Sequence, residues 1–218
     1  MSEERLIRQC APTLAGIKTG SLFPCPYETR EELMADVRAF NRRFAARGLC
    51  LLPLRLENGH ALLYLYRPAE LRRDLQNGLA REILSSAGYR CGSCEGCVTD
   101  LVRRLRGSAE FPHEIGLFLS YPPEDVRGFI ENRAQNFKRA GLWKVYGDEA
   151  RAEALFRKFK KCTQIYCERW PSRSEIRRNY YEENTCDLLE RHGQHRGHGK
   201  RGRRRHEGSR SGRHVLDG

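Results

Sequence analysis

Three regularly spaced cysteines are the residues of this chain best suited to bind a metal. In the run Cys91-Gly-Ser-Cys94-Glu-Gly-Cys97, small residues separate the thiols, so that three sulfurs can converge on one centre. Iron–sulfur clusters use this spacing with a further cysteine, and tetrahedral zinc also needs a fourth ligand. The fold would have to supply that ligand from Cys162, Cys167 or Cys186. The cofactor stays open: the candidates are an iron–sulfur cluster or zinc, and the alternatives are a loop with free thiols or a dithiol switch.

A second group of polar residues surrounds the segment 111–146. The apolar run 115–119 predicts a buried strand, Pro122-Pro123 open a helix that Gly141 closes, and 142–146 predict a second strand. Such a unit would bind ligands at its strand ends. The expected ligand-binding residues here are His113, Glu114, Tyr121, Asp125 and Lys144. Two of them have alternative structural interpretations, because Asp125 suits a helix N-terminus and a lone histidine is usually structural.

The N-terminal segment from Cys10 to Lys18 completes the expected ligand site. Residues 14–17 predict a short strand that packs on the sheet. The order Gly16-Ile17-Lys18-Thr19 is not that of a phosphate-binding P-loop, which requires a glycine directly before the lysine. The alternative is a ligand loop that offers the Lys18 side chain and backbone amides.

The remaining pattern predicts an α/β fold, with α+β as the variant. Thr29 and Glu32 form a capping box before an apolar helical stripe that ends at Gly48. Asn58-Gly59 joins two strands, 49–56 and 61–66, in a hairpin. Helices are expected from Pro68 to about Gly88, over 98–105, and after Asp148. We expect one domain over 1–170, with a mixed sheet of four or five strands covered by amphipathic helices, then a partly helical extension over 171–190.

Basic charge is concentrated at the C-terminus. Residues 191–218 hold nine Lys/Arg and two acidic residues, whereas the whole 218-residue chain has a net charge of +12. This His/Arg-rich tail has no apolar periodicity, so it is expected to be disordered, and it could attract nucleic acid weakly and non-specifically. Residues 1–20 lack the apolar core of a signal peptide, and no stretch is long and apolar enough for a membrane span. A cytoplasmic protein with reduced thiols and no membrane partner is expected.

Several segments together resemble a known bacterial family. They are Cys10-Ala-Pro-Thr-Leu-Ala-Gly-Ile-Lys18, the strand end at 63–67, Phe111-Pro-His-Glu-Ile-Gly-Leu-Phe-Leu-Ser-Tyr-Pro122, 124–126 and Trp143-Lys-Val-Tyr-Gly-Asp148. Over residues 8–168 the chain is similar to the family catalogued as domain of unknown function three-seven-nine-three. The resemblance implies an intracellular single-domain protein and no particular reaction. The cysteine run 91–97 and the basic tail lie outside the family pattern.

These observations favour a protein that binds a small ligand or metal at the strand tips, with the cysteine-rich loop as a metal or iron–sulfur site. One alternative is a thiol- or metal-dependent redox enzyme. Another is a nucleic-acid-associated protein that acts through its tail. No motif decides whether the chain is an enzyme.

Overall fold

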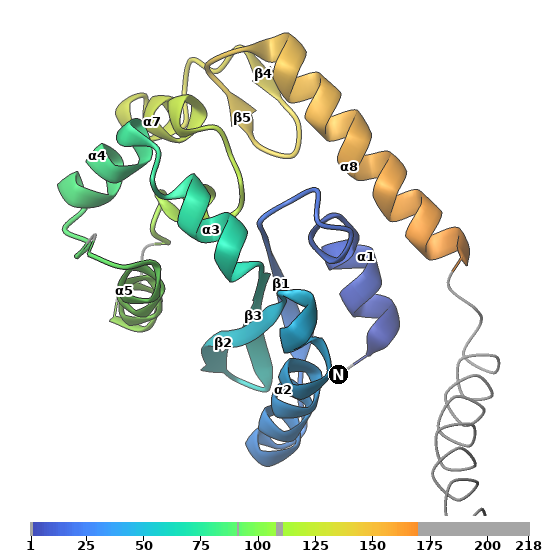
Figure 1. The fold of residues 1–218 in the computed structure, drawn as a ribbon. Helices are drawn as coiled ribbons and strands as arrows, with labels where there is room; N and C mark the ends of the chain where they lie inside the picture. The colour runs from blue at the N-terminus through green and yellow to red at the C-terminus, as the bar shows by residue number, and fades with distance from the viewer. Residues whose placement is uncertain (1, 91, 108–110, 170–218) are drawn as a thin grey trace, which may run out of the picture. The chain divides into compact units, whose positions relative to one another are not determined.

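A three-stranded antiparallel sheet is the centre of the fold in the computed structural model, which describes residues 2–90, 92–107 and 111–169 (Figure 1). Its strands are β1 (Gly20–Pro26), β2 (Cys50–Glu57) and β3 (His60–Tyr66), in the order β1-β3-β2. Proline explains this order, because it cannot donate a ladder hydrogen bond and is confined to edge strands. Both edge strands contain proline, and the central strand β3 contains none.

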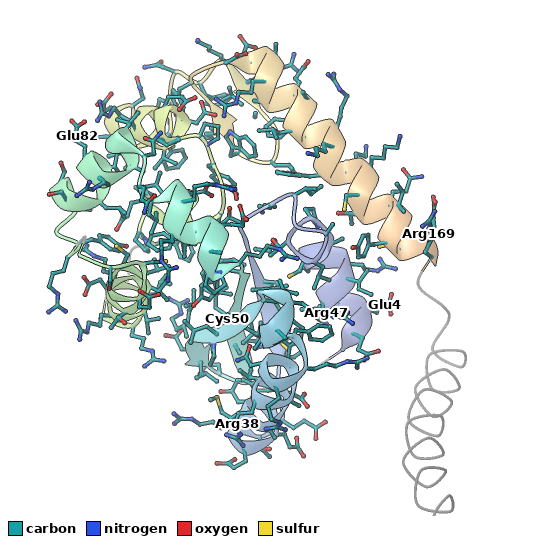
Figure 2. The ribbon with its side chains drawn as sticks, viewed as in Figure 1. Glu4, Arg38, Arg47, Cys50, Glu82 and Arg169 are labelled. Atoms are coloured by element: carbon teal, nitrogen blue, oxygen red, sulfur yellow. The ribbon has the colours of Figure 1, made fainter. Side chains whose placement is uncertain are left out.

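One face of the sheet is covered by α1 (Glu3–Leu14) and α2 (Arg30–Phe44), the latter followed by a short 3₁₀ helix, η1 (Ala45–Arg47). Alternate residues of β3 point to this face, where Leu63 and Leu65 are fully buried. The helices add apolar side chains at helical spacing, namely Leu6, Cys10, Leu33, Val37 and Phe40. The polar sides of the helices face outward, as Arg38 shows in Figure 2.

The other face packs against α3 (Pro68–Asp74), α4 (Gly78–Ser86), α5 (Cys94–Gly107) and α6 (Ile115–Phe118). Tyr64 points to this side from β3, is fully buried, and donates a hydrogen bond to the Phe118 carbonyl at 2.6 Å. The apolar cluster on this face includes Leu54, Leu71, Leu84, Leu101, Leu105 and Phe118. Because β3 is buried on both faces, it reads as a nearly continuous apolar run.

A smaller layer follows in the chain. It consists of α7 (Pro123–Glu131), a two-stranded hairpin of β4 (Arg139–Ala140) and β5 (Lys144–Val145), and the long helix α8 (Glu149–Arg169). Its apolar core is formed by Trp143, Val145, Ala152 and Phe159. Helix α8 also packs on α1, so the two ends of the described chain lie against each other.

The α/β class is confirmed, as are several local predictions. The backbone N–H of Glu32 donates to the Thr29 hydroxyl at 3.2 Å, as the capping box requires. Gly48 has a φ of 70°, the left-handed conformation of a helix end. Asn58-Gly59 joins β2 to β3, and the Asp148 carboxylate accepts from the backbone N–H of Arg151 at the start of α8.

The strand predicted over 115–119 is wrong, because these residues form the single turn α6. Short apolar runs do not distinguish a buried strand from a buried helix. Here the backbone forms its hydrogen bonds locally, for example Leu117 N to Glu114 O at 3.0 Å. Without this strand there is no strand–helix–strand unit, and the five described strands form two antiparallel sheets rather than one mixed sheet.

Three other elements differ from their predicted extent. Residues 14–17 are the end of α1 and a loop, not a strand. The helix expected from Pro68 to Gly88 is divided into α3 and α4, because the Asn77 side chain accepts from the backbone N–H groups of Leu79 and Ala80 and starts a new helix. Helix α7 ends at Glu131, where the chain enters positive φ at Arg133 and Ala134.

The expected extension and basic tail, residues 171–218, lie outside the described residues. Within the described part of the chain, no helix combines the length and the apolar character needed to cross a bilayer.

Candidate functional site

A cleft with a volume of about 620 Å³ collects side chains from segments far apart in the sequence. One wall is the loop 16–19 between α1 and β1, and another is the end of α3 with Asp74. The turn after α6, with Ser120 and Tyr121, and the inner side of α8, with Leu155 and Phe159, complete the lining. Two of the predicted ligand residues, Lys18 and Tyr121, therefore line one cavity.

The loop that carries Lys18 is held rigidly by backbone hydrogen bonds. The N–H groups of Ile17 and Lys18 both donate to the Pro12 carbonyl, at 3.0 and 3.2 Å. Arg67 reinforces the loop by donating from Nε to the Thr13 carbonyl at 2.8 Å. The amides of the loop already have protein acceptors, which leaves the backbone part of the alternative ligand loop without free donors. The loop offers its side chains alone.

The Lys18 ammonium lies between two aromatic rings. Its Nζ is 6.0 Å from the ring centroids of both Tyr121 and Phe159. Among the described residues it forms no ion pair and no hydrogen bond. Burial lowers the pKa of Lys18 to about 8, and the nearby Cys10 thiol opposes that shift. The wall of the cleft thus carries an amine whose charge no carboxylate of the described residues balances.

Thr19 connects the lysine loop to two other walls of the cleft. Its hydroxyl donates to Asp74 Oδ2 at 2.5 Å, and its backbone N–H donates to the Ser120 hydroxyl at 2.7 Å. Ser120 has a φ of 63°, which is uncommon for a residue with a side chain. Burial raises the pKa of Asp74, although the Thr19 hydrogen bond acts in the opposite direction. Asp74 is therefore a carboxyl group in the cleft that retains a proton more readily than usual.

The other cations of the cleft are paired. Arg73 forms an ion pair with Glu70 on the same helix. Arg151 Nη1 lies 3.6 Å from Glu124 Oε1, and both side chains are well exposed. These pairs leave Lys18 as the cation of the described cleft that is available to an anionic ligand.

Cys10 lies behind the lysine rather than in the cleft lining. Its side chain is fully buried in the core between α1 and the sheet. Burial raises the pKa of Cys10 to about 12, while Lys18 and the Ser21 hydroxyl lower it less strongly. The Cys10 thiol is therefore neutral at physiological pH, and it leaves the Lys18 charge uncompensated.

Asp125 does not line the cleft. Its buried carboxylate accepts three hydrogen bonds: from Trp143 Nε1 at 2.7 Å, and from the backbone N–H groups of Tyr146 at 2.8 Å and Gly147 at 2.7 Å. These bonds connect α7 to the hairpin. Trp143 in turn stacks on Tyr121, with ring centroids 4.8 Å apart, so Asp125 supports one wall of the cleft from behind.

The other predicted ligand residues also lie away from the cleft. His113 is exposed and meets the Phe129 ring edge-on at 5.0 Å. Glu114 is buried, and its Oε1 lies 3.9 Å from Arg104 Nη1. Burial is the main cause of the raised pKa of Tyr89, and Glu114 contributes to the same shift. Lys144 donates from Nζ to the Ala134 carbonyl at 2.7 Å. The fold therefore does not bring the predicted ligand set together.

Cys94 and Cys97 occupy the first turn of α5 and line a second cavity of about 360 Å³ with Arg72 and Arg81. Both side chains are buried, and burial raises the pKa of Cys94. Cys91 lies outside the described residues. Among the described residues, no cluster of three or more His, Cys, Asp or Glu side chains has a metal-binding arrangement.

Several lining residues were not anticipated from the sequence. Thr19 and Asp74 are 55 positions apart, and no local pattern signals their hydrogen bond. Phe159 belongs to an apolar helical stripe and reads as an ordinary core residue. Its position opposite Lys18 depends on the packing of α8 against α1.

Comparison with known proteins assigns the chain to a family. Residues 6–178 match the family model described as "Protein of unknown function (DUF3793)". No curated protein and no solved structure matches the chain.

Proposed function

The chain belongs to the DUF3793 family, whose description assigns no reaction. We propose that it binds a small organic anion in the Lys18 cleft. The ligand has a carboxylate or similar group and an apolar body. The anionic group pairs with the Lys18 ammonium, and the apolar body contacts Leu117, Leu155 and Phe159.

The observation that carries this proposal is the unbalanced charge of Lys18. A half-buried ammonium without a carboxylate partner is unfavourable, because burial removes part of its hydration. An anionic ligand would restore the balance, and in a partly desolvated site this pairing is stronger than at an exposed surface.

The remaining lining suits a small molecule. The volume of about 620 Å³ lies within the usual range for ligand sites. Its lining combines apolar side chains, such as Leu155 and Phe159, with polar and charged ones, such as Gln76 and Asn77. Here the Thr19–Asp74 and Thr19–Ser120 hydrogen bonds fix the polar groups in place.

Isothermal titration calorimetry of the full chain with hydrocinnamate, hexanoate and inorganic phosphate tests the proposal. We expect the two carboxylates to bind and phosphate to bind more weakly, because phosphate has no apolar body. Lys18→Met should weaken carboxylate binding at least about tenfold, or about 1.4 kcal/mol. Lys144→Met is the matched control, since Lys144 also lies near aromatic rings but outside the cleft. Absence of binding, or equal binding by Lys18→Met, would refute the proposal.

A second candidate function uses Cys94 and Cys97. Their positions on one helical turn, both facing the same cavity, support a thiol site for a metal or for disulfide formation. Metal analysis of the protein purified without oxygen tests it. Bound zinc or iron that is lost in Cys94→Ser but retained in Cys50→Ser would support a metal site. If the protein contains no metal, disulfide formation is the remaining role for Cys94 and Cys97. Failure of these two cysteines to form a disulfide with a mild oxidant would exclude that role as well.

A further inference from the structure

We propose that Lys18 is a nucleophile that forms an imine with an α-keto acid bound in the cleft. This inference rests on the proposed function, because the keto acid must first enter the same cleft as an anion paired with the Lys18 ammonium, which then loses a proton to become the nucleophile. It adds the chemical class of the ligand and a covalent step.

The position of Lys18 suits this chemistry. Amines act as nucleophiles only when neutral, and enzymes obtain a neutral lysine by partly removing it from water. Lys18 lies near the rings of Tyr121 and Phe159, and no carboxylate of the described residues pairs with its ammonium. By contrast Lys144, which also lies near aromatic rings, donates to a backbone carbonyl and does not line the cleft.

The electrostatic surroundings of Lys18 favour the neutral amine at mildly alkaline pH. Its pKa is lowered to about 8, chiefly by burial. The titratable and charged groups around it come from α1, α3, the turn after α6, and α8: Cys10, Glu70, Arg73, Asp74, Tyr121 and Arg151. Glu70 is paired with Arg73, and the Cys10 thiol is neutral. These groups leave the amine without a stabilising anion.

The step balances without an oxidant or a further reactant. The neutral Lys18 amine attacks the keto carbon, a C–N bond forms, and the oxygen takes up a proton to give a carbinolamine. Loss of water then gives the protonated imine, so one proton is consumed and one water is released. Asp74, whose pKa is raised by burial, is the carboxyl group of the cleft suited to deliver that proton.

Reductive trapping of the full chain tests the inference. Phenylpyruvate is added with cyanoborohydride, which reduces an imine to a stable secondary amine, and peptide mass spectrometry locates the modified lysine. We expect modification at Lys18 at least about tenfold faster than at Lys144 in the same digest. Its advantage over ordinary lysines should be largest below about pH 8 and shrink towards about pH 10, where those lysines also become neutral. Modification spread evenly over the lysines, or absent from Lys18, would overturn the inference.

Two comparisons separate this inference from the binding proposal. Hydrocinnamate has the same carboxylate and phenyl ring but no keto group, so it reports binding alone. If hydrocinnamate binds and phenylpyruvate does not modify Lys18, the imine step is wrong and the binding cleft stands. If hydrocinnamate does not bind, the proposed function fails first. Lys18→Arg should lose the modification, and Asp74→Asn should slow the modification about tenfold or more.

Discussion

At the scale of single residues, Asp125 shows how one buried carboxylate can organise a whole segment. Its two oxygens accept one indole N–H and two backbone N–H groups, which joins the start of α7 to the end of the hairpin. A buried acceptor with several donors is costly to alter, because each donor that loses its partner remains desolvated. Asp125 is thus a structural residue that supports Tyr121 through Trp143.

The substitution Asp125→Asn should lower the free energy of unfolding by about 2–3 kcal/mol, because the new amide group points N–H donors at N–H donors. Urea denaturation monitored by tryptophan fluorescence measures this change. Asp148→Asn is the matched control, since asparagine caps a helix as well as aspartate does and should alter stability by less than about 0.5 kcal/mol. Equal stability of wild type and Asp125→Asn would show that these three hydrogen bonds contribute little.

Lys18 and Tyr121, two of the residues predicted to bind a ligand, line the cleft. The sequence does not predict the residues that lie beside them there. A lysine beside glycine and an aromatic residue before prolines are visible as local features. Thr19, Asp74 and Ser120 carry no comparable signal, because their role depends on hydrogen bonds across 55 and 101 positions. A site that combines His113, Glu114, Asp125 and Lys144 requires a strand over 115–119, and the structure has a helical turn there.

At the scale of elements, glycine explains how α7 approaches the hairpin. A side-chain carbon at Gly128 would overlap Cβ and Cγ of Tyr146. Glycine is unfavourable within a helix by about 1 kcal/mol relative to alanine, so its presence here reflects close packing. The contact between α7 and the ring of Tyr146 offsets the lower helix propensity of glycine at this position.

Replacement of Gly128 by alanine should therefore destabilise the protein by about 1–3 kcal/mol, despite the gain in helix propensity. The opposite is expected for Gly78→Ala at the start of α4, where an added carbon meets no atom within 4 Å. That control should be neutral or stabilising by up to about 1 kcal/mol. Melting temperatures of the two variants measure the contrast. A stabilised Gly128→Ala would mean that Tyr146 moves aside easily.

Elements with self-contained signals were predicted well, and those that depend on distant contacts were not. The Asn58-Gly59 hairpin and the helix capped by Thr29 are encoded by adjacent residues. The turn at 115–118 is buried on all sides, so its sequence is apolar throughout and has no period to distinguish helix from strand. The break at Asn77 was missed because the apolar spacing continues across it.

At the scale of the whole molecule, charge is distributed very unevenly. Residues 191–218 contribute nine of the 40 Lys/Arg and two of the 28 acidic residues. Basic segments of this kind bind phosphates by releasing counterions, and such binding weakens steeply with salt.

Deletion of 191–218 should abolish salt-sensitive retention of the protein on DNA or RNA. Deletion of 207–218 is a matched control, because this shorter segment holds two arginines and two acidic residues and removes no net charge. Filter binding at low and high salt compares the two with the full chain. Retention that survives the longer deletion would assign the binding to another surface.

The cleft has walls from α3, α8, the loop before β1 and the turn after α6, so it exists only when distant parts of the chain have come together. A ligand that binds this cleft has no binding site on the unfolded chain. By mass action, such a ligand stabilises the folded form. Cellular supply of the ligand would therefore set how long each copy of the protein survives proteolysis.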